Sequence, residues 1–274
     1  MSKFQFRNKT IYYTLDGEDT KPKVLILNGI MMSTRSWDPL MKHLLDHFCV
    51  LRVDFLDQGL SDRMDQPYDQ SLQVEMLNAL LASLDISSIH VVGISYGGEV
   101  ALQLASRFQD KVKRLMIFHS CAYTSPLLKD VGRAWMKAGE KRDGSLYYKV
   151  TIPTIYSAQF YEKHIDWMKQ REKLLTPYFS DADFLDAMER LTASAENYDV
   201  RNQLETIDNE TMVITAEEDA LTPRKDQAYL VKHLKHAHWV SLPGVGHASM
   251  YESPLIFVTL IIGFLLANDG IINI

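Results

Sequence analysis

Cysteine is scarce in this sequence, and the two that occur lie far apart. Cys49 and Cys121 both stand among apolar residues, and neither belongs to a CxxC pair or to a spacing that would hold a metal ion. This usage excludes a disulfide framework and gives no sign of a metal site. We expect two buried free thiols in a cytoplasmic protein.

Long apolar runs and clusters of basic residues are also missing. The most apolar stretch, Leu255–Ala267, has 13 residues, fewer than the roughly 20 that cross a bilayer. We therefore expect a buried C-terminal helix and no membrane partner. The formal net charge is −6 and no segment is rich in lysine or arginine, which argues against binding to nucleic acid. The N-terminus lacks the apolar core of a secretory leader, which again favours the cytoplasm.

What the sequence does contain is an alternation of short apolar runs with helical patterns. This order is typical of an α/β fold, in which helices cover both faces of a mostly parallel sheet. Residues 4–19 predict an antiparallel hairpin at the sheet edge. The predicted strands are 23–28, 49–54, 89–94, 112–118, 211–216 and 238–242, and the helices between them include 38–48, 71–84 and 97–108.

The alternation stops between residues 122 and 197. This stretch has helical patterns interrupted by prolines and a glycine, and it is dense in Trp, Tyr, Phe and Met. We therefore predict an α/β core of residues 1–121 and 198–274, with residues 122–197 inserted as a helical cap. Because ligand pockets are mostly apolar and aromatic, we expect Trp135, Tyr156 and Phe160 of the cap, with Met31 of the core, to line a covered cavity.

Three glycines surround one serine where a predicted strand meets a predicted helix. Gly93, Gly97 and Gly98 flank Ser95, although glycine weakens both strands and helices. A chain that reverses sharply at the serine needs small residues on both sides, because side chains would collide across the turn. Gly93-Ile94-Ser95-Tyr96-Gly97 therefore matches the GxSxG nucleophile elbow, which presents a serine hydroxyl above the edge of a sheet.

Four further segments make the sequence similar to the α/β-hydrolase family. They are "NGIMMSTRSW" after the first parallel strand, "DFLDQGLSD" (with Asp57 where glycine is usual), "TAEEDALTP" and "PGVGHAS". In the family these correspond to the oxyanion loop, a D-x-x-G-x-G-x-S segment, the acid loop and the histidine loop. The resemblance runs from about Lys23 to the C-terminus and implies an α/β-hydrolase fold with an inserted helical cap.

A serine nucleophile needs a base and an acid that orients the base. His247 lies in a turn-rich loop after the last predicted strand, and the Ser-Asp-His order of the family makes it the candidate base. Asp219 follows a predicted strand by three residues and aligns with the family's acid, with Glu217 and Glu218 as nearby competitors. We predict that Ser95, His247 and Asp219 form a catalytic triad.

Acyl transfer also requires hydrogen-bond donors for the oxyanion. The resemblance assigns this role to two backbone N–H groups, those of Tyr96 and Ile30. Many relatives have His-Gly in the first loop, whereas this chain has Asn28-Gly29. We expect Asn28 to order the loop. The glycine-rich turn lacks the lysine of a phosphate-binding loop and the spacing of a dinucleotide fingerprint, so no cofactor and no metal are expected.

These residues predict a serine hydrolase that cleaves an ester or lactone of a small, fairly apolar acyl substrate. Hydrolysis of a C–C bond stays open, although such relatives commonly carry Asn where this chain has Ile94. A cofactor-free haloperoxidase activity would use the same triad. A different alternative is a signalling protein that binds a small ligand and then a protein partner. Turnover of simple esters separates the enzymes from the receptor.

Two further expectations concern substrate charge and assembly. Four cap arginines are candidate readers of a substrate carboxylate, and the apolar C-terminal helix is a candidate dimer contact. On that helix Phe257, Ile261 and Phe264 are spaced to face the sheet, while Ile256, Val258 and Ile262 are apolar on other faces. Such a helix is normally covered all round, either by the tail "NDGIINI" or by a second subunit. The four arginines are Arg133, Arg142, Arg171 and Arg190.

Overall fold

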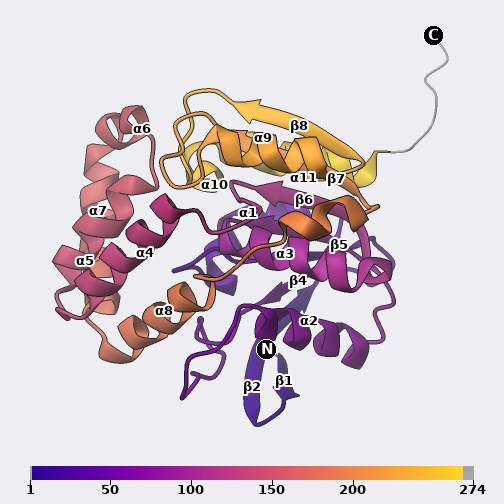
Figure 1. Ribbon diagram of the computed structural model, residues 1–274, viewed down its shortest axis with the longest axis horizontal. Coiled ribbons are helices and arrows are strands. Elements are labelled where there is room, and N and C mark those ends of the chain that lie inside the picture. The colour runs from indigo at the N-terminus through magenta and orange to yellow at the C-terminus, as the bar shows by residue number, and fades with distance from the viewer. Residues whose placement is uncertain (1, 268–274) are drawn as a thin grey trace.

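The computed structural model describes residues 2–267, whose eight strands form one sheet (Figure 1). The strand order is β1-β2-β4-β3-β5-β6-β7-β8. β1 pairs antiparallel with β2 and β2 with β4, and every later pair is parallel. The edge hairpin and the mostly parallel sheet are therefore as predicted. The strands are β1 (Ser2–Phe6), β2 (Lys9–Asp16), β3 (Lys23–Leu27), β4 (Cys49–Val53), β5 (Ile89–Ile94), β6 (Val112–Phe118), β7 (Glu210–Ala216) and β8 (Ala237–Leu242).

Helices cover both faces of the sheet, which explains why the strands read as continuous apolar runs. In β3, Leu25 and Leu27 belong to one apolar cluster and Val24 and Ile26 to another, because successive side chains point to opposite faces. Side chains of α2, α3 and α9 complete the first cluster, and those of α1 and α11 the second. These helices are α1 (Asp38–Leu44), α2 (Ser71–Ser83), α3 (Tyr96–Arg107), α9 (Arg224–His233) and α11 (Pro254–Leu266), with the short α10 (Ser249–Glu252) before the last.

Five helices lie between β6 and β7 and gather at one end of the sheet, on the left of Figure 1. Four of them begin with a side-chain N-cap, such as Ser125 for α4 and Asp181 for α8. They share an apolar cluster of their own that contains Tyr147, Tyr148 and Phe179. A bridge between residues 123 and 199 joins the two ends of this insertion. The helices are α4 (Pro126–Gly139), α5 (Gly144–Thr151), α6 (Ala158–Lys163), α7 (Ile165–Phe179) and α8 (Ala182–Ser194).

The apolar C-terminal segment forms α11, as predicted. Phe257 and Ile261 are fully buried and Phe264 nearly so, whereas Leu255 and Ile256 are 69 % and 51 % exposed. The tail considered as a cover for this helix, 268–274, lies outside the described residues. No helix within residues 2–267 has both the length and the apolar character needed to cross a bilayer.

Candidate active site

Ser95 stands at the sharp turn between β5 and α3, as the glycine pattern predicts. Its backbone has φ 53° and ψ −122°, a strained conformation for a residue with a side chain. A Cβ added at Gly93 would lie 2.3 Å from the carbonyl oxygen of Gly97, and one added at Gly97 would lie 2.4 Å from that of Leu27. The glycines are therefore needed for close backbone approach, and the surrounding contacts hold the serine in its strained geometry.

A short hydrogen bond joins the predicted base to the predicted acid. His247 Nδ1 lies 2.7 Å from Asp219 Oδ2, which also accepts a hydrogen bond from the Thr222 hydroxyl. Asp219 Oδ1 accepts from the backbone N–H groups of Leu221 and Thr222. Burial raises the pKa of Asp219, but the charge and hydrogen bond of His247 outweigh it, so the pKa is lowered overall. An ionised Asp219 can only accept, so His247 Nδ1 donates, and in the tautomer that acts as a base Nε2 carries the lone pair.

The two neighbouring acids point away from this pair. Glu217 and Glu218 are exposed, and Glu217 accepts a hydrogen bond from Ser241 and pairs with Arg224. Asp219 is the acid of this loop that contacts the imidazole.

The loop that carries His247 is fastened to the inserted helices by a residue that the sequence analysis did not single out. The Glu252 carboxylate accepts hydrogen bonds from the Gly246 N–H at 3.1 and 3.2 Å. The same carboxylate accepts from the Ser157 N–H at 3.0 Å and from the Ser157 hydroxyl at 2.6 Å. Glu252 therefore fixes the position of the loop one residue before the histidine. Its only signal in the sequence is an acid shortly after the "PGVGHAS" segment.

A second histidine packs beside the first. The ring centroids of His119 and His247 are 5.9 Å apart, and His119 Nε2 lies 2.5 Å from the Ser249 hydroxyl. Burial lowers the pKa of His119 to about 3. His119 is therefore neutral near pH 7 and adds no positive charge that would repel a protonated His247.

Two backbone N–H groups are free to bind an anion at the edge of the sheet. Tyr96 is the first residue of α3, so its N–H has no acceptor within the helix. Ile30 lies in the loop after β3, and its N–H makes no hydrogen bond within residues 2–267. As predicted, Asn28 orders this loop: its amide donates to the Val53 carbonyl at 2.9 Å and accepts from the Trp37 indole N–H at 2.8 Å.

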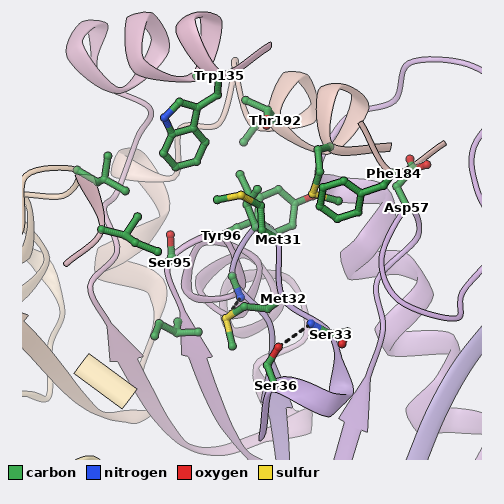
Figure 2. Close-up of a pocket in the computed structure, with 18 of the residues that line it drawn as sticks. Met31, Met32, Ser33, Ser36, Asp57, Ser95, Tyr96, Trp135, Phe184 and Thr192 are labelled. Atoms are coloured by element: carbon green, nitrogen blue, oxygen red, sulfur yellow. Dashed lines mark hydrogen bonds between the residues drawn. The ribbon is translucent and has the colours of Figure 1, made fainter. Parts of the chain in front are cut away.

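A cavity of about 870 Å³ lies between the carboxyl ends of the strands and the inserted helices. Figure 2 shows the Ser95 hydroxyl, Met31 and Trp135 directed toward this space. Ile30, Tyr96 and His247 line it too, although no hydrogen bond joins the side chains of Ser95 and His247 within the described residues. Much of the remaining wall is apolar, with Met32, Met136, Phe179, Phe184, Met188 and Met250.

Of the four residues that we predicted to line the cavity, two do so and two do not. Met31 and Trp135 line the cavity, but Tyr156 and Phe160 do not. The rings of Tyr156 and Phe160 stack on each other with centroids 5.5 Å apart and meet the edge of Trp167. These two aromatics stabilise the packing of the inserted helices themselves. The high density of aromatic residues in this part of the sequence is compatible with either role, so it could not show which of them line the pocket.

Asp57, which stands where the family usually has glycine, forms an ion pair that crosses from the core to the insertion. Its backbone φ is 69° and its side chain is fully buried. The Arg190 guanidinium of α8 donates to it with Nη2–Oδ1 at 2.7 Å and Nε–Oδ1 at 3.1 Å. Arg190 is therefore occupied by a protein carboxylate and is not free to read a substrate.

The fold and the sequence define the class of this protein. Residues 22–254 match the family described as the alpha/beta hydrolase fold, in line with the parallel sheet and the strained serine turn. The chain belongs to that family, and the protein is an α/β-fold hydrolase.

Known proteins show how closely the chain follows its relatives. The crystal structure of MGS-M2, an alpha/beta hydrolase enzyme from a Medee basin deep-sea metagenome library, shares 45% sequence identity over 100% of both chains with a TM-score of 0.97. A pimeloyl-[acyl-carrier protein] methyl ester esterase of Neisseria meningitidis is 28% identical over 88% of this chain and 93% of its own. The enol-lactonase of Burkholderia xenovorans has the same fold, with a TM-score of 0.84 at 20% identity over 97% of this chain and 100% of its own.

Proposed function

We propose that the protein is a serine hydrolase that cleaves an ester or lactone of a small, fairly apolar substrate through an acyl-enzyme. The observation that carries this proposal is the Asp219–His247 pair, with its 2.7 Å hydrogen bond, facing the same cavity as the strained Ser95. A serine hydroxyl is a weak nucleophile near neutral pH and needs such a base.

In the acylation step Ser95 Oγ attacks the acyl carbonyl carbon while His247 Nε2 takes the hydroxyl proton. Since the two side chains share no hydrogen bond in the free protein, the hydroxyl turns toward the ring when substrate fills the cavity. Asp219, whose pKa lies below its ordinary value, stays ionised and stabilises the imidazolium that forms. The imidazolium then protonates the leaving oxygen, and the alcohol departs.

The negative charge that develops on the carbonyl oxygen is held by the N–H groups of Ile30 and Tyr96. Both line the cavity with Ser95, and the N-terminus of α3 adds its partial positive charge. One such donor is worth about 3 kcal/mol of transition-state stabilisation in serine proteases. Water then repeats the sequence on the acyl-enzyme, with His247 as base, and releases the acid.

The relatives and the cavity wall support ester chemistry on an apolar acyl group. The Neisseria relative is named for a methyl ester substrate, and the burial of an acyl chain against methionine and phenylalanine side chains contributes roughly 0.8 kcal/mol per CH₂. Because methionine is flexible, such a wall fits acyl groups of different shapes.

Hydrolysis of p-nitrophenyl acetate, butyrate and octanoate tests the proposal. We expect a burst of p-nitrophenolate equal to the enzyme concentration or steady turnover, and a loss of at least about 10³-fold in Ser95→Ala. Ser106→Ala is the matched control, because Ser106 lies on the same helix and bonds to Gln203 rather than facing the cavity. Turnover that persists in Ser95→Ala contradicts the proposal, and the absence of any turnover favours the ligand-receptor alternative.

A further inference from the structure

The four arginines of the insertion differ in what balances their charge. Arg133 pairs with Asp130 and Glu196, Arg142 with Asp186, and Arg190 with Asp57. Arg171, on α7, forms an ion pair with no carboxylate of residues 2–267, although it lies partly buried. A guanidinium withdrawn from water without an anion is unfavourable, so its position calls for a partner that the described chain does not supply.

Aromatic rings hold Arg171 in place and bring it close to the histidine loop. Its Cζ atom lies 4.6 Å from the ring centroid of Tyr251 and 5.2 Å from that of Trp167. Tyr251 lies on α10, four residues after His247 in the sequence. Both Arg171 and Tyr251 line the cavity that contains Ser95. The cation therefore faces the substrate space on the side of the proposed base.

One atom of the Arg171 guanidinium is also buried without a hydrogen-bond partner. Six buried side-chain nitrogen or oxygen atoms of the described residues have no hydrogen-bond partner, and two of them are Arg171 Nε and the Tyr156 hydroxyl oxygen. Both side chains pack on the ring of Trp167. Buried polar groups are nearly always satisfied in native proteins, so the unpartnered Nε atom shows that the described protein leaves the guanidinium incompletely satisfied. Of the two residues, only Arg171 lines the cavity.

The acidic residues near the cavity are engaged elsewhere and do not neutralise Arg171. Asp57 binds Arg190, Glu196 binds Arg133, and Asp181 caps α8. On the same helix, the neighbouring Glu172 pairs with Lys149. Asp54 accepts from the backbone N–H groups of Thr34 and Leu60, and Glu99 from Gln70.

We propose that Arg171 binds a carboxylate carried by the substrate, so that the preferred substrate is an ester or lactone with a free carboxylate at its other end. The inference rests on the proposed function, because it assigns one end of the substrate to Arg171 and the other to Ser95. A planar carboxylate matches the guanidinium fork, and its negative charge balances the positive charge of Arg171. The apolar side chains that line the same cavity accommodate the connecting methylene chain.

Two esters that differ mainly in charge test the inference. Monomethyl adipate carries a carboxylate where methyl hexanoate has a methyl group, and release of methanol reports hydrolysis of both. We expect the wild-type protein to favour monomethyl adipate at least about 10-fold in kcat/KM, since a hydrogen bond to a charged group contributes enough for roughly 10- to 100-fold. Arg171→Met removes this preference, mainly through KM, while methyl hexanoate hydrolysis stays within about 3-fold. Arg171→Lys retains part of the preference.

The controls separate failure of the inference from failure of the proposed function. Arg142→Met, which removes a cap arginine outside the cavity, is expected to keep the wild-type preference. A wild-type protein without preference, or an Arg171→Met variant that keeps it, overturns the inference while Ser95-dependent hydrolysis stands. If neither ester is hydrolysed in a Ser95-dependent way, the proposed function fails. In that case, calorimetric titration of monomethyl adipate into Ser95→Ala and into the double variant with Arg171→Met still tests the inference. We expect weaker binding by the double variant, and equal affinities overturn the inference.

Discussion

Glu99 is a buried carboxyl group in the first turn of α3, at the edge of the cavity, and it makes the stability of the protein depend on pH. Its side chain accepts hydrogen bonds from the Gln70 amide at 2.7 Å and from the Cys121 thiol at 3.5 Å. Burial raises its pKa from the ordinary 4.5 to about 7, and the hydrogen bonds and the charge of His247 only partly oppose this. The group is 5 % exposed, so solvent screening is slight.

The sign of the effect follows from proton binding. Between pH 4.5 and 7 the folded protein keeps a proton that the unfolded chain has released, so the free energy of unfolding falls as pH rises through this window. Below pH 4.5 Glu99 is protonated in both states and contributes nothing. Each pKa unit corresponds to about 1.4 kcal/mol, so the full cost above pH 7 is about 3 kcal/mol.

The substitution Glu99→Gln isolates this cost, because glutamine keeps the acceptor for Gln70 and cannot ionise. Urea unfolding of both proteins at pH 5 and pH 8.5 gives the difference in free energy of unfolding at each pH. We expect the variant to gain roughly 2 to 3 kcal/mol relative to wild type between these pH values. Groups common to both proteins cancel in this difference. Glu189→Gln, which removes an exposed acid, serves as control, and a Glu99→Gln difference that is the same at both pH values refutes the reasoning.

Three further predictions follow from the fold. Arg190→Met leaves the fully buried Asp57 carboxylate without its partner and should lower the free energy of unfolding by about 3 kcal/mol. Asp57→Gly should cost less, because glycine relieves a φ of 69°. Urea unfolding that reverses this order contradicts the ion-pair account. Gly97→Ala places a Cβ 2.4 Å from a backbone oxygen and should destabilise the fold by ~3 kcal/mol, so near wild-type stability and activity would be contrary evidence. We propose a dimer through the exposed face of α11, which light scattering should detect and Ile256→Glu should abolish; a wild-type monomer at micromolar concentration rules it out.

Much of the core could be predicted because its signals are local. Runs rich in Val, Ile and Leu predicted the parallel strands, because a strand that is buried on both faces is apolar at nearly every position. The crowding of Gly93 and Gly97 around Ser95 gave the turn, because a Cβ at either position would meet backbone atoms. Asp219 could be preferred over Glu217 because it aligns with the acid of a known family, while the residues themselves left both open.

The lining of the cavity could not be predicted because it depends on how the inserted helices are rotated and packed. The rings of Tyr156 and Phe160 stack on each other, which nothing in their sequence neighbourhood indicates. The ion pair of Arg190 depends on an acid distant in the chain, because Asp57 and Arg190 are 133 positions apart. The unusual aspartate at position 57 signalled a local peculiarity, but its partner is visible only in three dimensions. Arg171 differs from the other three arginines of the insertion because it forms no ion pair within the described residues, and this too is visible only in the structure.

The most direct test of the central claim is a crystal structure of the protein after reaction with an alkyl p-nitrophenyl phosphonate. We predict a covalent bond between Ser95 Oγ and phosphorus, with the phosphoryl oxygen within about 3 Å of the N–H groups of Ile30 and Tyr96. We also predict His247 Nε2 at hydrogen-bond distance from Oγ, with its bond to Asp219 intact. Phosphorus on another residue, or a phosphoryl oxygen turned away from both N–H groups, would contradict the account.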